Sequence, residues 1–211
     1  MIIAVDGPAA SGKGTLARRI ATHFEFAYLD TGKIYRAVGY RVLESGVDPD
    51  DPEAALAAAQ ALQAADLDNA ELTSDRVAVA ASKVAAIEAV RAVLLGFQQT
   101  FAATPPGDAA GAVLDGRDIG TVVCPDAAVK LFVTAAVAER ARRRHKELLD
   151  KGEPSIYSRV LQALKDRDAR DSNRSAAPLV AASDAIEIDT TAMDPDEAFA
   201  AALASIQQHT G

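Results

Sequence analysis

The sequence predicts an α/β protein in which helices flank a central parallel β-sheet. Short apolar runs alternate along the chain with longer segments of helical periodicity, and this alternation is typical of a parallel sheet. The first apolar run, "MIIAV", leads through a glycine-rich stretch into a helical segment, so the expected first unit is strand, loop and helix. A length of 211 residues with 49% hydrophobic composition suits a single domain with one sizeable core.

The remaining elements follow from local patterns. Strands are expected at residues 1–5, 26–30, 112–115, 128–133 and 185–189, which are short, apolar and bounded by turn residues. Helices are expected from residue 16 onward and at 31–46, 51–65, 81–103, 137–150, 158–171 and 194–208. Residues 67–79 have a weak signal and fit either a small hairpin or a loop, while 104–111 and 151–155 are expected loops.

Composition narrows the classes of partner. The net charge of −8 argues against a nucleic-acid partner, although residues 139–174 carry 11 basic and 7 acidic side chains, a local excess of +4 that suits a small anionic ligand. No apolar run has the length of a membrane span, and no leader precedes the first strand, so a cytoplasmic protein is expected. The one cysteine, Cys124, excludes an internal disulfide and is expected to be a small buried residue.

The stretch "GPAASGKGT" fits the phosphate-binding pattern G-x-x-x-x-G-K, known as the P-loop. Inward-pointing N–H groups, the helix N-terminus and the Lys13 ammonium together suit a nucleotide polyphosphate. Gly14 stands where Ser or Thr usually follows the lysine, so Thr15 is the candidate for Mg²⁺, directly or through water. A glycine-rich turn without chemical purpose is the alternative. The predicted ATP-binding residues are Gly7, Pro8, Ala9, Ala10, Ser11, Gly12, Lys13, Gly14 and Thr15.

Polar clusters also follow two later strands. Thr31 is expected at a helix N-cap with Arg36 further along that helix, and plain capping with Arg36 in solvent is the alternative. Asp115 ends an apolar strand, as a Mg²⁺-orienting carboxylate would, and Arg117 and Asp118 follow it at once. Because the carboxyl ends of parallel strands meet at one sheet edge, these side chains are expected to join the glycine-rich loop there.

The segment "KDRDARDSNR" carries a third cluster. If it is helical, Arg167, Arg170, Asp171 and Arg174 are spaced i, i+3, i+4 and i+7 and share one face. A salt-bridged face in solvent is the alternative. Guanidinium groups bind phosphate at two points, so arginines that converge with one acid suit a ligand with an anionic end.

Taken together, "GPAASGKGT", "LDTGKIYR", "ASKVAAIEAVR", "DGRDIGTVVCPDA" and "RDARDSNRSAAPL" closely resemble bacterial cytidylate kinases, which phosphorylate CMP and dCMP. The resemblance spans nearly the whole chain. It implies a single P-loop kinase domain over residues 1–211, with ATP and Mg²⁺ as cofactors. The implied parts are a core (1–65, 105–149 and 161–211), a lid (150–160) and an NMP-binding segment (66–104). The β-rich insert normal in that segment is shortened to "LDNAELTSDRVAV".

The resemblance also implies roles for individual residues. The CMP phosphate would be held by Thr31, Arg36, Arg117 and Arg167, the cytosine by Ser82, Arg91 and Asp118, and the sugar by Asp171 and Arg174, with Tyr35 also in the CMP site. Lys13, Arg140 and Arg167 would be catalytic. The arginines at 142–144 would lie towards ATP and the lid, with the choice among them open.

Two other functions stay open from the sequence. One is a P-loop kinase of another small acceptor such as UMP, and the other is a regulatory module that responds to nucleotide. The arginine-rich face at 167–174 speaks against a switch, which needs no second anion site, and neither Asn69 nor Asn173 begins the guanine-reading motif N-K-x-D. The resemblance suggests a monomer that works on small molecules.

Overall fold

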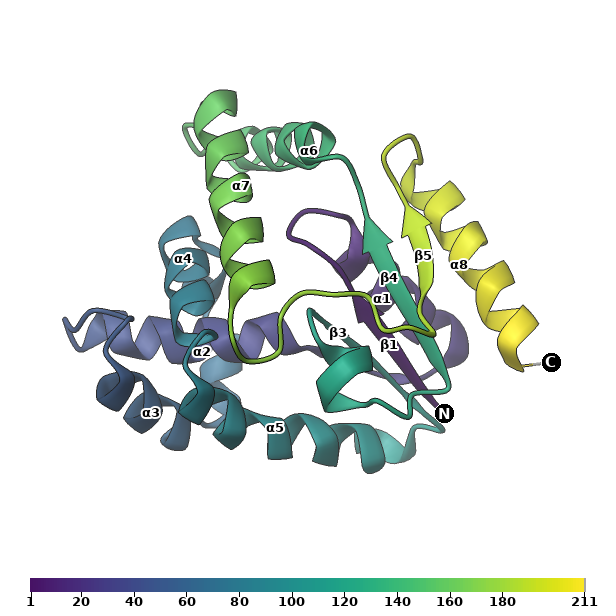
Figure 1. Ribbon diagram of the computed structural model, residues 1–211, viewed down its shortest axis with the longest axis horizontal. Helices are drawn as coiled ribbons and strands as arrows, with labels where there is room; N and C mark the ends of the chain where they lie inside the picture. The colour runs from purple at the N-terminus through teal and green to yellow at the C-terminus, as the bar shows by residue number, and fades with distance from the viewer. Residues whose placement is uncertain (211) are drawn as a thin grey trace.

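A computed structural model describes residues 1–210 and confirms the predicted α/β fold (Figure 1). Five parallel strands form one sheet in the order β2-β3-β1-β4-β5. The strands are β1 (Ile2–Asp6), β2 (Ala27–Asp30), β3 (Ala112–Gly116), β4 (Val129–Thr134) and β5 (Ile186–Asp189). Gly211, the last residue of the predicted domain, lies outside the described residues.

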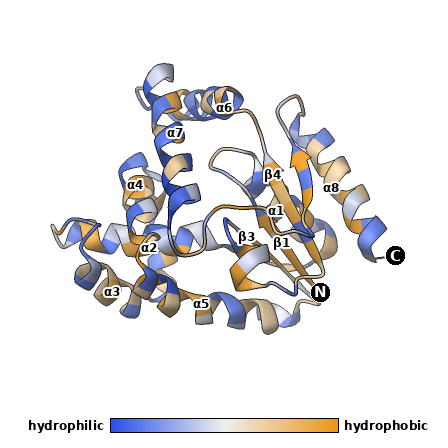
Figure 2. Cartoon of the chain, in the orientation of Figure 1, coloured by the Kyte–Doolittle hydropathy of each residue, from blue (hydrophilic) through white to orange (hydrophobic). Residues whose placement is uncertain are grey.

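Helices cover both faces of the sheet because each central strand is apolar on both sides. In β1, Ile3 and Val5 pack in a core with α1 (Lys13–Phe24) and α8 (Pro195–Thr210). Ala4 points to the opposite face and packs in the second core. The helices that build the second core are α2 (Thr31–Glu44), α3 (Pro52–Gln60), α4 (Asp75–Val84) and α5 (Glu88–Ala103). Figure 2 shows the strands mainly in the hydrophobic colour and the helices with mixed faces.

Two further helices stand at the carboxyl ends of the strands. α6 (Val137–Asp150) follows β4, and α7 (Tyr157–Asn173) packs against it after the predicted break at 151–155 (Figure 1). A small core of Ala9, Ala141 and Leu164 joins this pair to the glycine-rich loop. The helix pair therefore forms one wall around that loop.

Residues 64–103 differ from the sequence prediction. The expected helix over 81–103 is two helices, α4 and α5, because residue Ile87 is extended (φ −84°, ψ 115°) and breaks the chain between them. α4 already begins at Asp75, where the Ser74 side chain accepts a hydrogen bond from the Val77 N–H at 3.4 Å. The hairpin alternative is wrong within the described residues, since two short 3₁₀ turns, η1 (Ala64–Asp68) and η2 (Ala70–Thr73), precede α4.

Two further predictions concern the cysteine and membrane-spanning helices. Cys124 is buried, as expected from the sequence. Across residues 1–210, the structure has no helix with both the length and the apolar character that crossing a membrane requires.

The central strands should dominate the stability of the fold. Leu114 in β3 is fully buried, so the change Leu114→Ala should lower the free energy of unfolding by about 3 kcal/mol through lost burial and a residual cavity. Urea denaturation followed by circular dichroism measures this change. Leu149→Ala is the matched control, because Leu149 is 51% exposed and its truncation should stay within about 0.5 kcal/mol. Equal losses in the two variants would contradict the assignment of the core.

Candidate active site

The glycine-rich loop links the end of β1 to the start of α1, and its conformation explains its composition. Gly7 has φ +149°, and a Cβ there would collide with the Val133 carbonyl oxygen, so only glycine fits. Ala10 also has a positive φ of 59°. α1 begins at Lys13, and the N–H groups of its first turn have no acceptor within the helix. The loop therefore ends in an N-terminus that suits an anion.

Lys13 lies in a buried cluster of charges at the sheet edge. Its Nζ is 3.6 Å from Oδ1 of Asp115, at the end of β3. Burial and the positive charge of Arg117 lower the pKa of Lys13 to about 8, while the carboxylates of Asp115 and Asp30 oppose the shift. An added negative charge in this cluster would stabilise the ammonium form of Lys13.

Asp115 also explains why glycine follows the lysine. A Cβ at Gly14 would lie 2.9 Å from Oδ2 of Asp115, so a side chain at this position would displace the carboxylate. Tyr28 donates a hydrogen bond to the same oxygen at 3.4 Å. Thr15, the next residue, is exposed in the first turn of α1.

The residues at this edge fit a Mg²⁺ ion that arrives with a nucleotide. The Asp115 Oδ1 is buried with no hydrogen-bond partner and has only the 3.6 Å ion pair to Lys13, so it can still accept a ligand. No group of three or more His, Cys, Asp or Glu side chains that could enclose a metal occurs among the described residues. Mg²⁺ is commonly bound by one or two carboxylates together with substrate phosphates, so a single carboxylate is sufficient here.

Two arginines share one carboxylate on the far side of this cluster. Arg117 donates from Nε to Oδ2 of Asp171 at 3.1 Å, and Arg167 Nε lies 3.8 Å from the same oxygen. Burial and the neighbouring Arg117 lower the pKa of Arg167 to about 9. Burial alone would raise the pKa of Asp171, but Arg117 and Arg167, together with Arg174, outweigh it and hold that pKa below its usual range. Arg117 thus comes from the end of β3, and α7 brings Arg167 and Asp171 to it at the sheet edge.

Thr31 and Arg36 reach the same edge from α2. The predicted N-cap role of Thr31 is wrong, because Asp30 caps the helix by accepting from the Lys33 N–H. Thr31 lies one residue inside the helix, where its hydroxyl donates to the Asp115 carbonyl at 2.8 Å. Arg36 donates to the Leu72 carbonyl at 2.8 Å, so the alternative of a guanidinium free in solvent is also wrong. Burial lowers the pKa of Arg36.

A second buried group of charges surrounds Asp118. Its carboxylate pairs with Arg91 of α5, and Nη2 of Arg174 lies 3.6 Å from its other oxygen. The guanidinium of Arg91 stacks over the ring of Tyr35 at 5.5 Å from the centroid. Burial raises the pKa of Tyr35, so its hydroxyl stays neutral. Of the residues predicted for the acceptor base, Arg91 of α5 and Asp118 of the loop after β3 therefore lie together, with Tyr35 of α2 against the guanidinium.

The sequence predicted that four charged residues would share one face of α7, but one of them, Arg174, lies outside the helix. α7 ends at Asn173, and Arg174 follows it in extended backbone (φ −64°, ψ 141°), where its Nε donates to the Ala177 carbonyl. Arg174 therefore reaches Asp118 from a loop and not from the shared helical face. Arg170 donates to the Ser82 hydroxyl at 3.3 Å and so connects α7 to α4.

The predicted catalytic residue Arg140 lies in the wall beside the glycine-rich loop. It donates to the Ala135 carbonyl at 2.8 Å and to the Ala9 carbonyl at 3.2 Å. Two further hydrogen bonds, at 3.1 and 2.6 Å, connect it to the carboxylate of Asp168 on α7. Arg140 thus holds the loop, α6 and α7 together.

The other arginines of α6 point in different directions. Arg142 is on the surface and pairs with Glu139. Arg143 donates to the carbonyl of Thr190 at 2.5 Å, in the loop that follows β5. Arg144 pairs with Asp75 at the start of α4 and faces Arg36 closely enough to affect its pKa.

A family model described as cytidylate kinase matches residues 3–208 of the chain. The chain belongs to the cytidylate kinase family. It is 60% identical over 205 residues to the cytidylate kinase of Paramagnetospirillum magneticum, covering 97% of each chain. It is 58% identical over 203 residues to that of Rhodospirillum rubrum, covering 96% of this chain and 95% of the relative. A crystal structure of an uncharacterized protein from Eubacterium ventriosum shares the fold, with a TM-score of 0.54 and 14% identity over 98% of each chain.

Sequence reasoning missed three carboxylates of this cytidylate kinase family member. Asp30 caps α2, Asp168 pairs with Arg140, and Asp6 accepts two backbone hydrogen bonds from the loop after β3. The sequence could have pointed to Asp6, since a charged residue directly after an apolar strand needs a partner when it is buried. No sequence pattern pointed to Asp168, because its partner Arg140 lies on a different helix.

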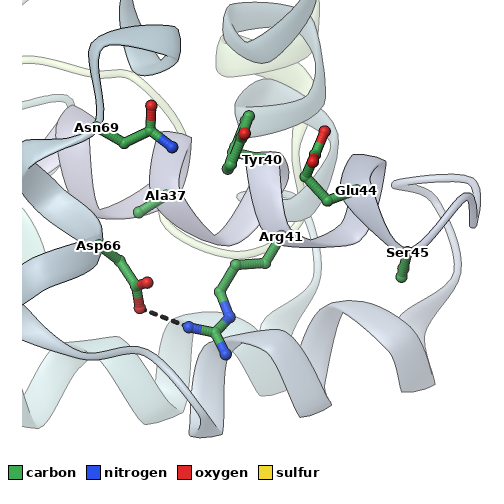
Figure 3. A pocket seen from close by; sticks show the side chains of 7 residues that line it. All are labelled: Ala37, Tyr40, Arg41, Glu44, Ser45, Asp66 and Asn69. Carbon is green, nitrogen blue, oxygen red and sulfur yellow. Dashed lines mark hydrogen bonds and ion pairs between the residues drawn. The ribbon is translucent and has the colours of Figure 1, made fainter.

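Two open hollows lie outside the residues predicted for the site. One, of about 400 Å³, lies between α2 and the η1–η2 segment, where Arg41 donates to Asp66 at 2.6 Å (Figure 3). The other is lined by Met1, Gly111 and Ala128, among others, and lies near the amino ends of the strands. None of the predicted site residues of this cytidylate kinase family member lines either hollow.

The buried pair of Arg140 and Asp168 should be essential for the wall beside the loop. Asp168→Ala leaves a buried guanidinium without its counterion, so it should lower the free energy of unfolding by about 3 kcal/mol. Arg142→Ala is the control, because the Arg142 side chain is 75% exposed and should change stability by less than about 1 kcal/mol. Urea unfolding of both variants measures the difference. A loss for Asp168→Ala no larger than for the control would contradict this role.

Proposed function

We infer that this chain is a phosphotransferase with cytidylate kinase activity, in which the γ-phosphoryl group of ATP passes to CMP or dCMP to give ADP and CDP or dCDP. The observation that carries this inference is the 60% identity to a cytidylate kinase over 97% of the chain. The site geometry supports it, because a polyphosphate-binding loop and a cluster of arginines lie at the same edge of the sheet.

Transfer of a phosphoryl group from ATP to CMP requires residues that bind the two nucleotides and neutralise their negative charge. An oxygen of the CMP phosphate forms a bond to the γ-phosphorus of ATP while the bond from that phosphorus to the bridging oxygen of ADP breaks. The acceptor phosphate is already anionic at pH 7, so no side chain has to remove a proton. The main obstacle is repulsion between two anions, and fixed cations near the transferred group lower it.

On the donor side, we assign the ATP phosphates to residues 7–15. The first-turn N–H groups of α1 and the ammonium of Lys13 would contact the β- and γ-phosphates. The Oδ1 of Asp115, which has no hydrogen-bond partner, and the hydroxyl of Thr15 are the groups of this chain that would hold Mg²⁺, directly or through water. Mg²⁺ would neutralise phosphate charge when it is bound.

On the acceptor side, we assign the CMP phosphate to Thr31, Arg36, Arg117 and Arg167. The support is electrostatic, since Arg117 and Arg167 both lower the pKa of Lys13 and so belong to the same cluster of charges. Arg36 also lies near Arg117, which contributes to the lowering of its pKa. Phosphate bound between these cations would relieve their mutual repulsion.

For the base, we assign Ser82, Arg91 and Asp118, with Tyr35 beneath the Arg91 guanidinium. Cytosine presents an amino donor and a carbonyl acceptor, which a carboxylate and a guanidinium complement in opposite directions. Asp118 and Arg91 are already paired and nearly buried, so their polar groups are held in fixed positions. Asp171 and Arg174 lie between this group and the phosphate arginines, which suits the sugar hydroxyls.

We propose that residues 66–104 form the CMP-binding segment and residues 150–160 the lid of a single domain. The support is that polar contacts from arginines connect the segment to neighbouring elements: Arg36 to Leu72, Arg144 to Asp75 and Arg170 to Ser82. Among the arginines at 142–144, Arg144 is the one we place towards the transferred phosphate, because it is largely buried and near Arg36. Arg140 would act by holding the loop at Ala9.

A kinase of another acceptor such as UMP is the second candidate, because the phosphate cradle by itself does not distinguish pyrimidines. A regulatory module is disfavoured by the second cluster of cations, which a switch does not need. We also propose a monomeric, cytoplasmic protein, in keeping with a reaction between small soluble nucleotides.

Acceptor preference tests the assignment of the base site. A coupled ADP-release assay over CMP, dCMP, UMP, AMP and shikimate should show the highest kcat/KM with the two cytidine nucleotides. Asp118→Ala should lower kcat/KM for CMP by about a hundredfold and should lower that for UMP much less, because a group aimed at the cytosine amino group is lost. Asp166→Ala, an exposed carboxylate on the same chain, is the control. Preference for a non-cytidine acceptor in the unmodified chain would defeat the proposal.

The lowered pKa of Lys13 predicts proton uptake when ATP binds. With a pKa of about 8, roughly half of the Lys13 side chains are neutral at pH 8, and phosphate binding should restore the ammonium form. Calorimetry with MgATP in buffers of different ionisation enthalpy should therefore detect uptake of up to about half a proton at pH 8 and much less at pH 7.

Lys13→Arg is the matched control for this measurement, because a guanidinium stays protonated at both pH values and should abolish the uptake. Uptake of the same size in Lys13→Arg would show that another group takes the proton.

A further inference from the structure

The turn that follows Asp118 is capped by a residue from a different strand. η4 (Ile119–Val123) has i→i+5 hydrogen bonding, and its first N–H groups have no acceptor within the turn. Asp6, at the end of β1, accepts both: Oδ1 from the Ile119 N–H and Oδ2 from the Gly120 N–H, each at 2.8 Å. Asp6 is only 6% exposed, and each of its carboxylate oxygens accepts one of these two backbone bonds.

Asp118 itself occupies the position that normally supplies such a cap. An aspartate directly before a helical turn usually folds back to accept a hydrogen bond from an N–H two or three residues on. The Asp118 side chain makes no such bond, and its carboxylate instead faces Arg91 and Arg174. Because Asp6 caps the turn, the Asp118 carboxylate remains available to other groups.

Asp6 is anchored on the most constrained strand of the sheet. β1 is central, and Asp6 pairs in register with Gly116 of β3 on one side and Phe132 of β4 on the other. Burial raises the pKa of Asp6 to about 6, and the two backbone N–H groups oppose the shift, so the carboxylate is ionised at pH 7.5. A fixed strand thus sets the start of the η4 turn.

We propose that Asp6 is a positioning residue for recognition of the acceptor base, which caps η4 and thereby keeps the Asp118 carboxylate directed into the acceptor pocket. This inference rests on the proposed function, in which Asp118 contacts cytosine. Without Asp6, the buried N–H groups of Ile119 and Gly120 would lack an acceptor, and Asp118 is the adjacent carboxylate that can supply one. If Asp118 turns back to do so, its carboxylate is withdrawn from the base.

The first test is Asp6→Asn in the full chain at pH 7.5. Asparagine has one acceptor oxygen, and its NH₂ group opposes the other backbone N–H. The KM for CMP should rise about tenfold, equivalent to about 1.4 kcal/mol, and the ratio of kcat/KM for CMP to that for UMP should fall by a similar factor. The KM for ATP and the kcat at saturating CMP should change by less than about twofold.

A second variant disturbs the same contact while Asp6 is retained, and it serves if Asp6→Asn does not fold. A Cβ added in Gly120→Ala would lie 3.1 Å from Cδ of Lys130 and 3.5 Å from Oδ2 of Asp6, so the turn and the Lys130 side chain must move apart by a few tenths of an ångström beside the Asp6 contact. The CMP/UMP ratio should fall in this variant too. Asp51→Asn is the matched control, because its carboxylate accepts from the N–H groups of Glu53 and Ala54 but caps α3. Because asparagine caps a helix about as well as aspartate, Asp51→Asn should change the melting temperature little and leave the CMP/UMP ratio unchanged.

A double-mutant cycle separates positioning from a merely structural role. If Asp6 acts through Asp118, adding Asp6→Asn to Asp118→Ala should leave the CMP/UMP ratio where Asp118→Ala alone puts it. Additive effects, or a loss of kcat with unchanged KM and ratio, would overturn the inference. An unchanged CMP preference in Asp118→Ala would overturn the proposed role of Asp118 together with it. A lost preference in Asp118→Ala beside an intact one in Asp6→Asn and Gly120→Ala would overturn this inference alone.

Discussion

Cationic side chains are buried next to one another at one edge of the sheet, and carboxylates placed between them make this arrangement stable. Lys13 lies beside Asp115, and Arg117 shares Asp171 with Arg167. The pKa values of Lys13 and Arg167 are lowered, so the carboxylates only partly offset the burial of these cations and the repulsion between them. A bound phosphate would supply the missing negative charge, so the same constraint that costs stability in the free protein favours ligand binding.

Apolar packing and polar contacts together hold the elements around this edge. The glycine-rich loop is attached to the sheet core, since Gly7 packs against the β4 backbone and Ala9 packs with Ala141 and Leu164. Residues 66–84 are packed as well, because Leu72 and Val77 cluster with Ala37 of α2. Hydrogen bonds and ion pairs from arginines of α2, α6 and α7 add to this packing.

Prediction from the sequence succeeded where a local structure depends on residues that are close together in the chain. The spacing of the glycines and Lys13 predicts the glycine-rich loop, and apolar periodicity predicts the strand before it and the helix after it. Prediction failed at Thr31, because Asp30 competes for the same capping role and the two differ by one position. It failed again over residues 81–103, where α4 and α5 are separate because they pack against different partners, α2 and α3 respectively.

The order of residues in the chain was enough to determine the parallel α/β class and the glycine-rich loop between the first strand and the first helix, because each depends on neighbours within a few turns of chain. The pairing of charges was decided only by folding. Asp6 meets Ile119 and Gly120 across more than a hundred residues, and Arg140 meets Asp168 across a helix pair. Local periodicity contains no information about which buried cation a distant carboxylate will neutralise, since that depends on how the sheet and helices pack.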